Sequence, residues 1–291
     1  VSDPAAMNRR TFLARSTTAL GIAGCSSGRA DNRRDERTVE AAPSTTERSG
    51  DRTMKLTLRR SADRGHADHG WLDSHHTFSF ADYHDQAHMG FRALRVINQD
   101  RVAAGMGFST HPHRDMEIFS YVLEGALQHK DSMGNGRVLK PGEIQLMSAG
   151  TGVTHSEFNP SQSDGLHFLK IWMVPNQRGL KPSYTEWKPT PATANAQDVV
   201  VISPDGRDGS AVIHQDAIVH RLRLRAGESV AHTVQQGRGA WLQLITGELR
   251  AGGDTLRAGD GASTEDAGTL TLTASQPVEA LLFDLGPFAG R

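Results

Sequence analysis

The sequence predicts an all-β protein made of two tandem β-barrels, and three observations lead to that prediction. From Met54 onward, short alternating segments are separated by Gly, Asn, Asp and Pro about every eight to twelve residues, which is typical of sandwiches and barrels rather than of β-α-β units. A long helical period is absent, and Pro277 and many glycines would break one. The third observation is an internal repeat. The clearest strand-like segments are 94–98, 118–123, 144–147, 166–174, 199–202, 218–224, 241–245, 269–273 and 280–285.

The internal repeat indicates two copies of one module. Segment 121–127 (YVLEGAL) resembles 243–249 (QLITGEL), and each is followed by a polar turn. Two barrels in tandem are the economical account of this similarity, and one larger sandwich is the alternative. The proline-rich segment 175–196 would cross from one barrel to the other. The expected parts are an N-terminal segment 1–53, a first domain 54–177 and a second domain 178–291.

Composition limits the classes of function. The 291 residues include 32 basic and 33 acidic side chains, and a formal net charge of -1 argues against a dedicated nucleic-acid or anionic-membrane binder. No apolar run is long enough for a transmembrane helix. One cysteine, Cys25, excludes an intrachain disulfide and a thiolate cluster, so a metal must be held by His, Asp or Glu. Neither a Gly-x-Ser-x-Gly elbow nor a glycine-rich phosphate loop is present.

The N-terminal segment reads as an export signal followed by a linker. Arg9-Arg10 within MNRRTFL resembles a twin-arginine motif, and Ile-Ala-Gly before Cys25 resembles a lipobox. Segment 26–53 is charged and lacks an apolar period, which predicts a disordered linker. We therefore expect twin-arginine export to the cell envelope with a lipid anchor at Cys25. The alternative is a cytoplasmic protein whose translation starts at Met54.

Two short motifs carry the chemistry. In His111-Pro112-His113, residues i and i+2 project from the same face of a strand, and a proline in the motif suggests an edge strand or a bulge. His155-Ser156-Glu157 has the same spacing. If the two segments are neighbours, their four side chains converge on one point, and three imidazoles with one carboxylate suit Fe, Cu, Ni, Mn or Zn. The simpler interpretation is a set of solvated histidines on loops.

Other candidates are weaker. Glu117, four residues after His113, is an alternative ligand to Glu157. His76 or His84 could line a pocket because aromatic residues surround them. In the second repeat His232 stands where a ligand pair is expected, but its i+2 neighbour is valine, so the second module is expected to hold no metal.

The two histidine motifs, His111-Pro112-His113 and His155-Ser156-Glu157, and the segments around them resemble the pirin family. The resemblance is strong from residue 54 to about 175, and the second half is similar to bacterial members. The segments that carry it are 64–73, 77–83, 95–98, 107–117, 121–125 and 155–157.

The resemblance implies two cupin (jelly-roll) barrels with one metal in the first. The implied ligands are His111, His113, His155 and Glu157. Fe(II) is the expected ion, and Cu, Ni, Mn, Co and Zn are alternatives. Bacterial members of the family show quercetin 2,3-dioxygenase activity.

We therefore expect a monomeric dioxygenase that cleaves a flavonol-like or enolic aromatic substrate with O₂ and releases carbon monoxide. The metal would acidify the substrate hydroxyl, and Glu157 would accept its proton. Phe80 and Phe108 are candidates for the walls of the cleft. The alternative is a non-catalytic, metal-dependent binding or redox-sensing protein, and a third interpretation is an empty site. No nucleic-acid partner is expected.

Overall fold

The computed structural model of the protein describes residues 54–288. The expected export signal, linker and Cys25 therefore lie outside the described residues. Within 54–288 the regular structure is almost entirely β, and the helices are two short 3-10 turns, Ser61–Asp63 and Arg207–Gly209. No helix of this part of the chain is long and apolar enough to span a bilayer. The all-β expectation is confirmed.

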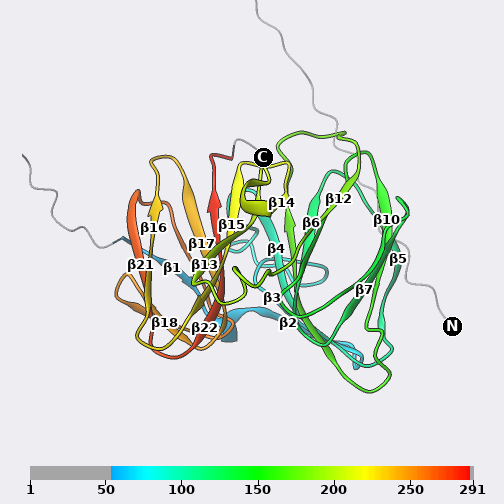
Figure 1. Cartoon of the computed structure of the whole chain (residues 1–291), viewed down its shortest axis with the longest axis horizontal. Helices are drawn as coiled ribbons and strands as arrows, with labels where there is room; N and C mark the ends of the chain where they lie inside the picture. The colour runs from blue at the N-terminus through cyan, green and yellow to red at the C-terminus, as the bar shows by residue number, and fades with distance from the viewer. Residues whose placement is uncertain (1–53, 289–291) are drawn as a thin grey trace, which may run out of the picture. The chain divides into compact units, whose positions relative to one another are not determined.

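The first barrel pairs a seven-stranded sheet with a four-stranded one (Figure 1). The large sheet runs in the order β12 (Ser183–Trp187), β9 (Ile144–Ser148), β6 (Glu117–Glu124), β11 (Leu166–Met173), β4 (Leu94–Val102), β3 (Leu72–His76) and β2 (Gly65–Asp68). The small sheet runs in the order β5 (Gly107–His113), β10 (Val153–Phe158), β7 (Leu127–Asp131) and β8 (Gly136–Leu139).

The second barrel repeats this arrangement of a seven-stranded sheet and a four-stranded sheet. Its large sheet runs in the order β1 (Thr57–Arg59), β20 (Gly261–Thr264), β17 (Gly239–Thr246), β22 (Val278–Leu285), β15 (Ala217–Leu224), β13 (Asp198–Ser203) and β14 (Ala211–Val212). Its small sheet runs in the order β16 (Ser229–Val234), β21 (Gly268–Ala274), β18 (Glu248–Ala251) and β19 (Asp254–Arg257). Since β6 and β17, which begin the two repeat segments, occupy equivalent positions, two tandem modules are confirmed over one large sandwich.

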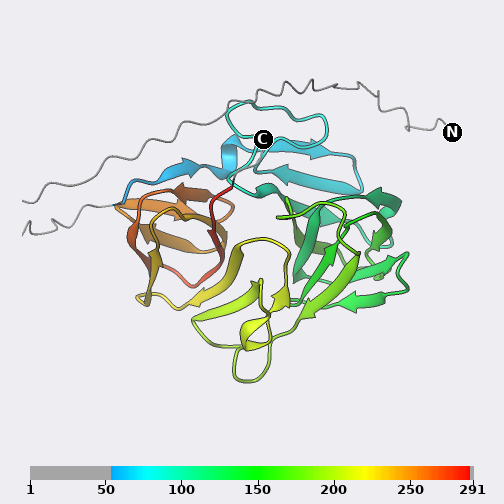
Figure 2. The same ribbon diagram turned by 90° about the horizontal axis from the view of Figure 1, so that it is seen from above.

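The edge strands of the two large sheets come from unexpected parts of the chain. β12 lies beyond residue 177, where the first domain was expected to end, yet it pairs with β9 of the first barrel. β1 begins the described chain but pairs with β20 of the second barrel, as Figure 2 shows for the blue strand beside the orange ones. Each large sheet gains a seventh strand in this way. Strand pairing therefore does not divide the chain into two barrels at a single boundary near residue 177.

The two large sheets share one hydrophobic core. Strand β6 has an almost entirely buried sequence, because one face lines its own barrel and the other packs against the second barrel. Phe119 and Phe283 meet across this junction with ring centroids 6.3 Å apart, and Phe78 contacts Trp241 at 4.8 Å. The small sheet of the first barrel, which carries both histidine motifs, lies opposite this packed side, so its site can open to a cavity.

Candidate metal centre

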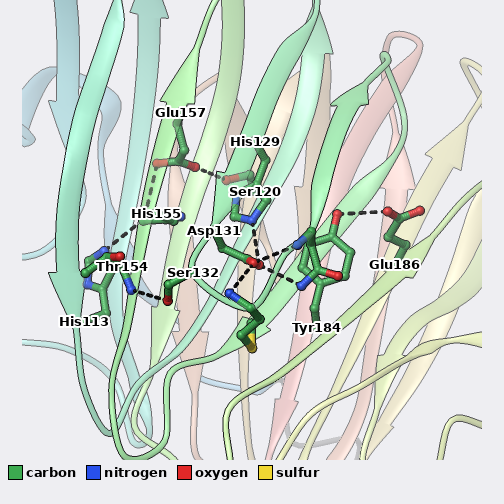
Figure 3. A network of polar contacts seen from close by, with 12 residues as sticks. His113, Ser120, His129, Asp131, Ser132, Thr154, His155, Glu157, Tyr184 and Glu186 are labelled. Carbon is green, nitrogen blue, oxygen red and sulfur yellow. Dashed lines mark hydrogen bonds and ion pairs between the residues drawn. The ribbon is translucent and has the colours of Figure 1, made fainter.

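The structure brings the three motif histidines together on β5 and β10. The strands pair antiparallel, with His155 opposite His111 and Val153 opposite His113, so all three imidazoles project from the same face of the small sheet. The Nε2 atom of His155 lies 3.0 Å from Nε2 of His111 and 3.0 Å from Nε2 of His113. Figure 3 shows the His113 and His155 rings pointing toward one another. Three nitrogen lone pairs therefore converge on one small volume.

The strand that carries His111 and His113 has two irregular features, a proline and a bulge. β5 is the edge of the small sheet, so the missing N–H of Pro112 leaves no partner strand without a donor, as the sequence suggested. The β5–β10 register shifts between His155 and Glu157, because β5 carries an extra residue there. This bulge places Glu157 opposite Phe108.

The histidines are prepared to act as ligands. The Nδ1–H of His111 donates to the Ser109 carbonyl at 2.7 Å, which leaves Nε2 with its lone pair free. Burial lowers the pKa of His155 to about 3 and that of His113 to about 4, although Glu157 opposes this effect in both cases. Both imidazoles are neutral at pH 7, which is the form that binds a metal.

The nitrogen spacing fits a transition-metal ion. With metal–nitrogen bonds of about 2.0–2.1 Å, two nitrogens lie about 3.0 Å apart at a 90° angle and about 3.4 Å apart at a tetrahedral angle. The two observed 3.0 Å spacings match the 90° case. Neutral imidazoles suit Fe, Cu, Ni and Zn. His111, His113 and His155 are therefore a chemically suitable donor set for a divalent ion.

Glu157 lies beside the three histidines and is shared with a lysine. Its Oε2 atom is 3.9 Å from Nε2 of His155 but only 2.7 Å from Nζ of Lys170. The Ser120 hydroxyl donates to Oε1 at 3.0 Å, a contact drawn in Figure 3. Burial alone would raise the pKa of Glu157, but the Lys170 ammonium and its other neighbours hold that pKa below its ordinary value. The carboxylate is ionised, and its role as fourth ligand stays a prediction.

The other candidate ligands lie elsewhere. Glu117 accepts hydrogen bonds from the Ser148 hydroxyl at 2.7 Å and from the His214 backbone N–H at 3.2 Å, at the junction with the second barrel. It is the first residue of a large-sheet strand and does not belong to the histidine cluster. In the second barrel, Nε2 of His232 lies 3.3 Å from Asp284, whose carboxylate also pairs with Arg238.

A cavity of about 720 Å³ opens beside the cluster. That volume is within the ~300–1,000 Å³ typical of small-molecule sites. His111 and His113 line it together with aromatic walls that include the two expected residues, Phe80 and Phe108. His76 also lines the cavity, whereas His84 is not among its lining residues. The aromatic walls are Trp71, Phe80, Tyr83, Phe108 and Trp172.

Several polar residues of this cavity were not predicted from the sequence. Lys170, Asn98 and Asp100 are buried on β11 and β4 and line the same space. The sequence does contain an indication of the buried lysine, because Lys170 interrupts the largely apolar segment LHFLKIWM of β11. Buried lysines are rare unless they are paired, so such an interruption points to a polar partner inside the barrel.

Two cupin barrels with a cluster of three histidines in the first define a double-cupin protein with a candidate metal centre in that barrel. The family model described as Pirin matches residues 57–173, and the model described as quercetinase C-terminal cupin domain matches residues 200–285. The chain belongs to the pirin family.

Individual relatives agree with this assignment. A protein of Escherichia coli named quercetin 2,3-dioxygenase is 48% identical over 232 residues, which is 80% of this chain and 99% of that protein. A putative quercetin 2,3-dioxygenase of Pseudomonas aeruginosa is 44% identical over 230 residues, covering 78% and 98% of the two chains. These names confirm the expected class, a quercetin 2,3-dioxygenase-like oxidoreductase.

Solved structures confirm the fold. YhhW from E. coli aligns with a TM-score of 0.78 at 45% identity, covering 81% of this chain and 100% of that one. A second structure of the same protein, described as a bacterial pirin in complex with nickel(II), aligns with a TM-score of 0.77 at 46% identity over 80% and 100% of the chains. A relative in this family therefore binds a divalent transition metal.

Proposed function

We propose that the protein is a metal-dependent dioxygenase that cleaves quercetin, or a similar flavonol or enolic aromatic compound, with O₂. The observation that carries the proposal is the placement of the histidine cluster, because His111 and His113 line an aromatic-walled cavity. Stacking on such walls would hold a planar aromatic substrate against the metal side of the barrel. The names of the relatives point to the same substrate class.

The proposed metal is one divalent ion held by His111, His113 and His155, with Glu157 as the proposed fourth ligand. Fe(II) is our first choice for a reaction with O₂, and Ni, Cu, Mn, Co and Zn are alternatives that the imidazole donors also accept. When bound, the ion supplies Lewis acidity that lowers the pKa of a coordinated substrate hydroxyl and brings substrate and O₂ together.

The protein's own groups then have separable roles. Glu157 is ionised and buried, and its Oε2 atom is 3.9 Å from a ligand nitrogen, so it lies within reach of a hydroxyl at the metal. We assign it the role of general base that accepts the proton of that hydroxyl. The aromatic walls exclude water and orient the ring, while Ser120 holds the carboxylate in place through its 3.0 Å hydrogen bond.

The test compares Glu157→Gln with the wild-type chain after loading with each metal. We expect quercetin consumption with carbon monoxide release in the wild type and at least a hundredfold lower rate in Glu157→Gln, with most of the metal retained. Glu124→Gln, at a side chain that is 69% exposed, is the matched control and should keep the wild-type rate. An unchanged rate in Glu157→Gln would overturn its assignment as the base. No turnover by the wild type with any metal, together with metal-dependent ligand binding, would favour the non-catalytic alternative.

A further inference from the structure

A row of polar side chains crosses the large sheet inside the first barrel. Strand register places His76 opposite Asn98, Asn98 opposite Lys170, Lys170 opposite Ser120 and Ser120 opposite Gln145. All five are buried, and none is more than 5% exposed. A barrel interior is normally filled by apolar side chains, so this row requires an explanation.

The end of the row beside the cavity contains unpaired acceptors. The Nε2–H of His76 bonds Ser74, whose hydroxyl donates to Asp100, so the Nδ1 atom of His76 is an acceptor. Neither that atom nor the Oδ1 atom of Asn98 has a hydrogen-bond partner among the described residues. A buried polar atom without a partner destabilises the folded state, and a ligand whose hydroxyl groups donate to these two acceptors would remove that cost.

Lys170 adds a positive charge to the same stretch. Its ammonium pairs with Glu157 at 2.7 Å and lies 3.8 Å from the centroid of the Phe108 ring. The ammonium has three N–H donors in all, which is more than a single carboxylate oxygen can use. A buried ion pair is often no more stabilising than apolar packing, so its presence in the cavity wall points to a role in binding rather than in stability.

Lys170 lies among several charged and titratable groups of the cavity wall. Among the described residues, the acidic groups near it are Glu157 on β10 and Asp100 on β4, and the titratable neighbours also include His113 on β5 and His155 on β10. Its uncharged neighbours include Asn98 on β4, Ser120 on β6 and Phe108 on β5. When Glu157 accepts the proton of a substrate hydroxyl, the negative charge moves to the substrate oxygen. The ammonium, which lies 2.7 Å from Glu157, then has an anionic substrate oxygen as an alternative partner.

We propose that Lys170 and Asn98 are the substrate-selecting pair of this enzyme. Lys170 binds the anionic oxygen of a hydroxylated aromatic enolate, and Asn98, with His76 beside it, accepts hydrogen bonds from the neighbouring hydroxyl groups. The inference rests on the proposed function and narrows its substrate class to aromatic compounds that have an ionisable enol and at least one further hydroxyl.

The role of the Lys170 charge is tested by measuring ligand affinity under conditions that prevent turnover. The metal-loaded full chain, kept free of O₂, is titrated with quercetin and with 3-O-methylquercetin, which cannot form the enolate. In Lys170→Gln the affinity for quercetin should fall about tenfold, whereas that for the methyl ether should change less than twofold; tenfold corresponds to about 1.4 kcal/mol. Lys140→Gln, at an exposed lysine, is the control and should change neither affinity. Equal loss of both ligands, or of neither, would overturn the role of Lys170.

The pH dependence of the reaction rate tests the role of Lys170 independently of the binding measurements. In Lys170→Gln the rate should rise with pH until the substrate ionises by itself, whereas the wild type should be active at lower pH, and Lys170→Arg should restore the wild-type profile. A merely structural role would lower the rate equally at every pH. Asn98→Leu should raise KM for quercetin but not for 3-hydroxyflavone, which lacks the further hydroxyl groups. If both substrates respond alike, Asn98 does not select hydroxyls.

The two proposals fail in different ways. If the wild type binds quercetin but does not consume it, the dioxygenase function is wrong. The affinities of Lys170→Gln for quercetin and its methyl ether still test the role of Lys170 in that case. If the wild type consumes quercetin and Lys170→Gln behaves identically in binding and pH profile, the function stands and the selection pair is rejected. Metal content and thermal unfolding of each variant, measured beside the wild type, separate these outcomes from loss of the metal or of the fold.

Discussion

His111 and His155 are direct partners across the β5–β10 ladder, and their Nε2 atoms lie 3.0 Å apart. Main-chain pairing therefore sets the spacing of two donor nitrogens, and the i+2 alternation of β5 adds His113. A donor set fixed by the backbone loses little conformational freedom when a cation arrives.

Removing one donor should remove the metal. We expect His155→Ala to weaken metal affinity by at least about a hundredfold, since even groups that only orient a ligand change affinity by about 10–100-fold. Elemental analysis after dialysis measures the bound metal. His84→Ala, at an exposed histidine away from the cluster, should retain the wild-type content. Full occupancy in His155→Ala would show that the cluster is not the metal site.

Removing the metal should lower the thermal stability of the protein without unfolding it. Both barrels have extensive cores of buried apolar side chains, so most of the folding energy does not depend on the metal site. A ligand at a hundred times its Kd stabilises the native state by about 2.7 kcal/mol. Chelation should therefore lower Tm by roughly 5–10 °C while the far-UV β spectrum is kept. Loss of that spectrum on chelation would mean that folding depends on the ion.

Arg59 should couple the edge strand β1 to the first barrel. It is buried, its Nε–H donates to the Thr77 carbonyl at 3.1 Å, and its guanidinium donates to the Tyr83 hydroxyl at 2.7 Å. Arg59→Met should destabilise the protein by about 1–3 kcal/mol in urea unfolding, because both acceptors lose a buried donor. Arg250→Met, at an exposed site of the second barrel, should change stability by less than about 0.5 kcal/mol. Equal stabilities of the two variants would contradict this coupling.

Asp100 should make stability depend on pH. Burial raises the pKa of Asp100 from 3.8 to about 6, although Lys170 and the Ser74 hydroxyl oppose the shift. Because the folded-state pKa is the higher one, the protonated form favours folding, and stability is lost as pH rises from about 4 to about 6. Asp100→Asn, which can keep the bond from Ser74, should abolish this loss, worth at most about 3 kcal/mol. Urea unfolding at pH 4 and pH 7 measures the difference, and parallel pH dependences of the two proteins would contradict it.

The part of the site that depends on local sequence could be predicted. His111 and His113 share a face because of strand geometry alone, and Pro112 at an edge strand follows from its missing N–H. The pairing of β5 with β10 needed only the assumption that the two motif strands are neighbours. Phe80 and Phe108 were predictable for the same reason, since both lie close in sequence to the histidine-rich segments.

The remote part of the site could not be predicted. Lys170 meets Glu157 across the barrel from the other sheet, and Asn98 lies beside Lys170 only because β4 and β11 pair in one particular register. A shift of one residue would turn each side chain to the opposite face, so spacing along the chain does not reveal which polar residues face inward. The exchange of β1 and β12 between barrels has the same origin, because edge pairing depends on the folded sheets and not on chain order.

The most direct test of the metal-centred dioxygenase follows both atoms of molecular oxygen. The full chain, loaded separately with each candidate metal, is incubated with quercetin and oxygen-18 gas in a sealed vessel, and the products are analysed by mass spectrometry. We predict one carbon monoxide released for each quercetin consumed and two labelled oxygen atoms in the organic product, for at least one metal and not for His155→Ala. Quercetin loss without carbon monoxide, or an equal yield from His155→Ala, would contradict the proposal.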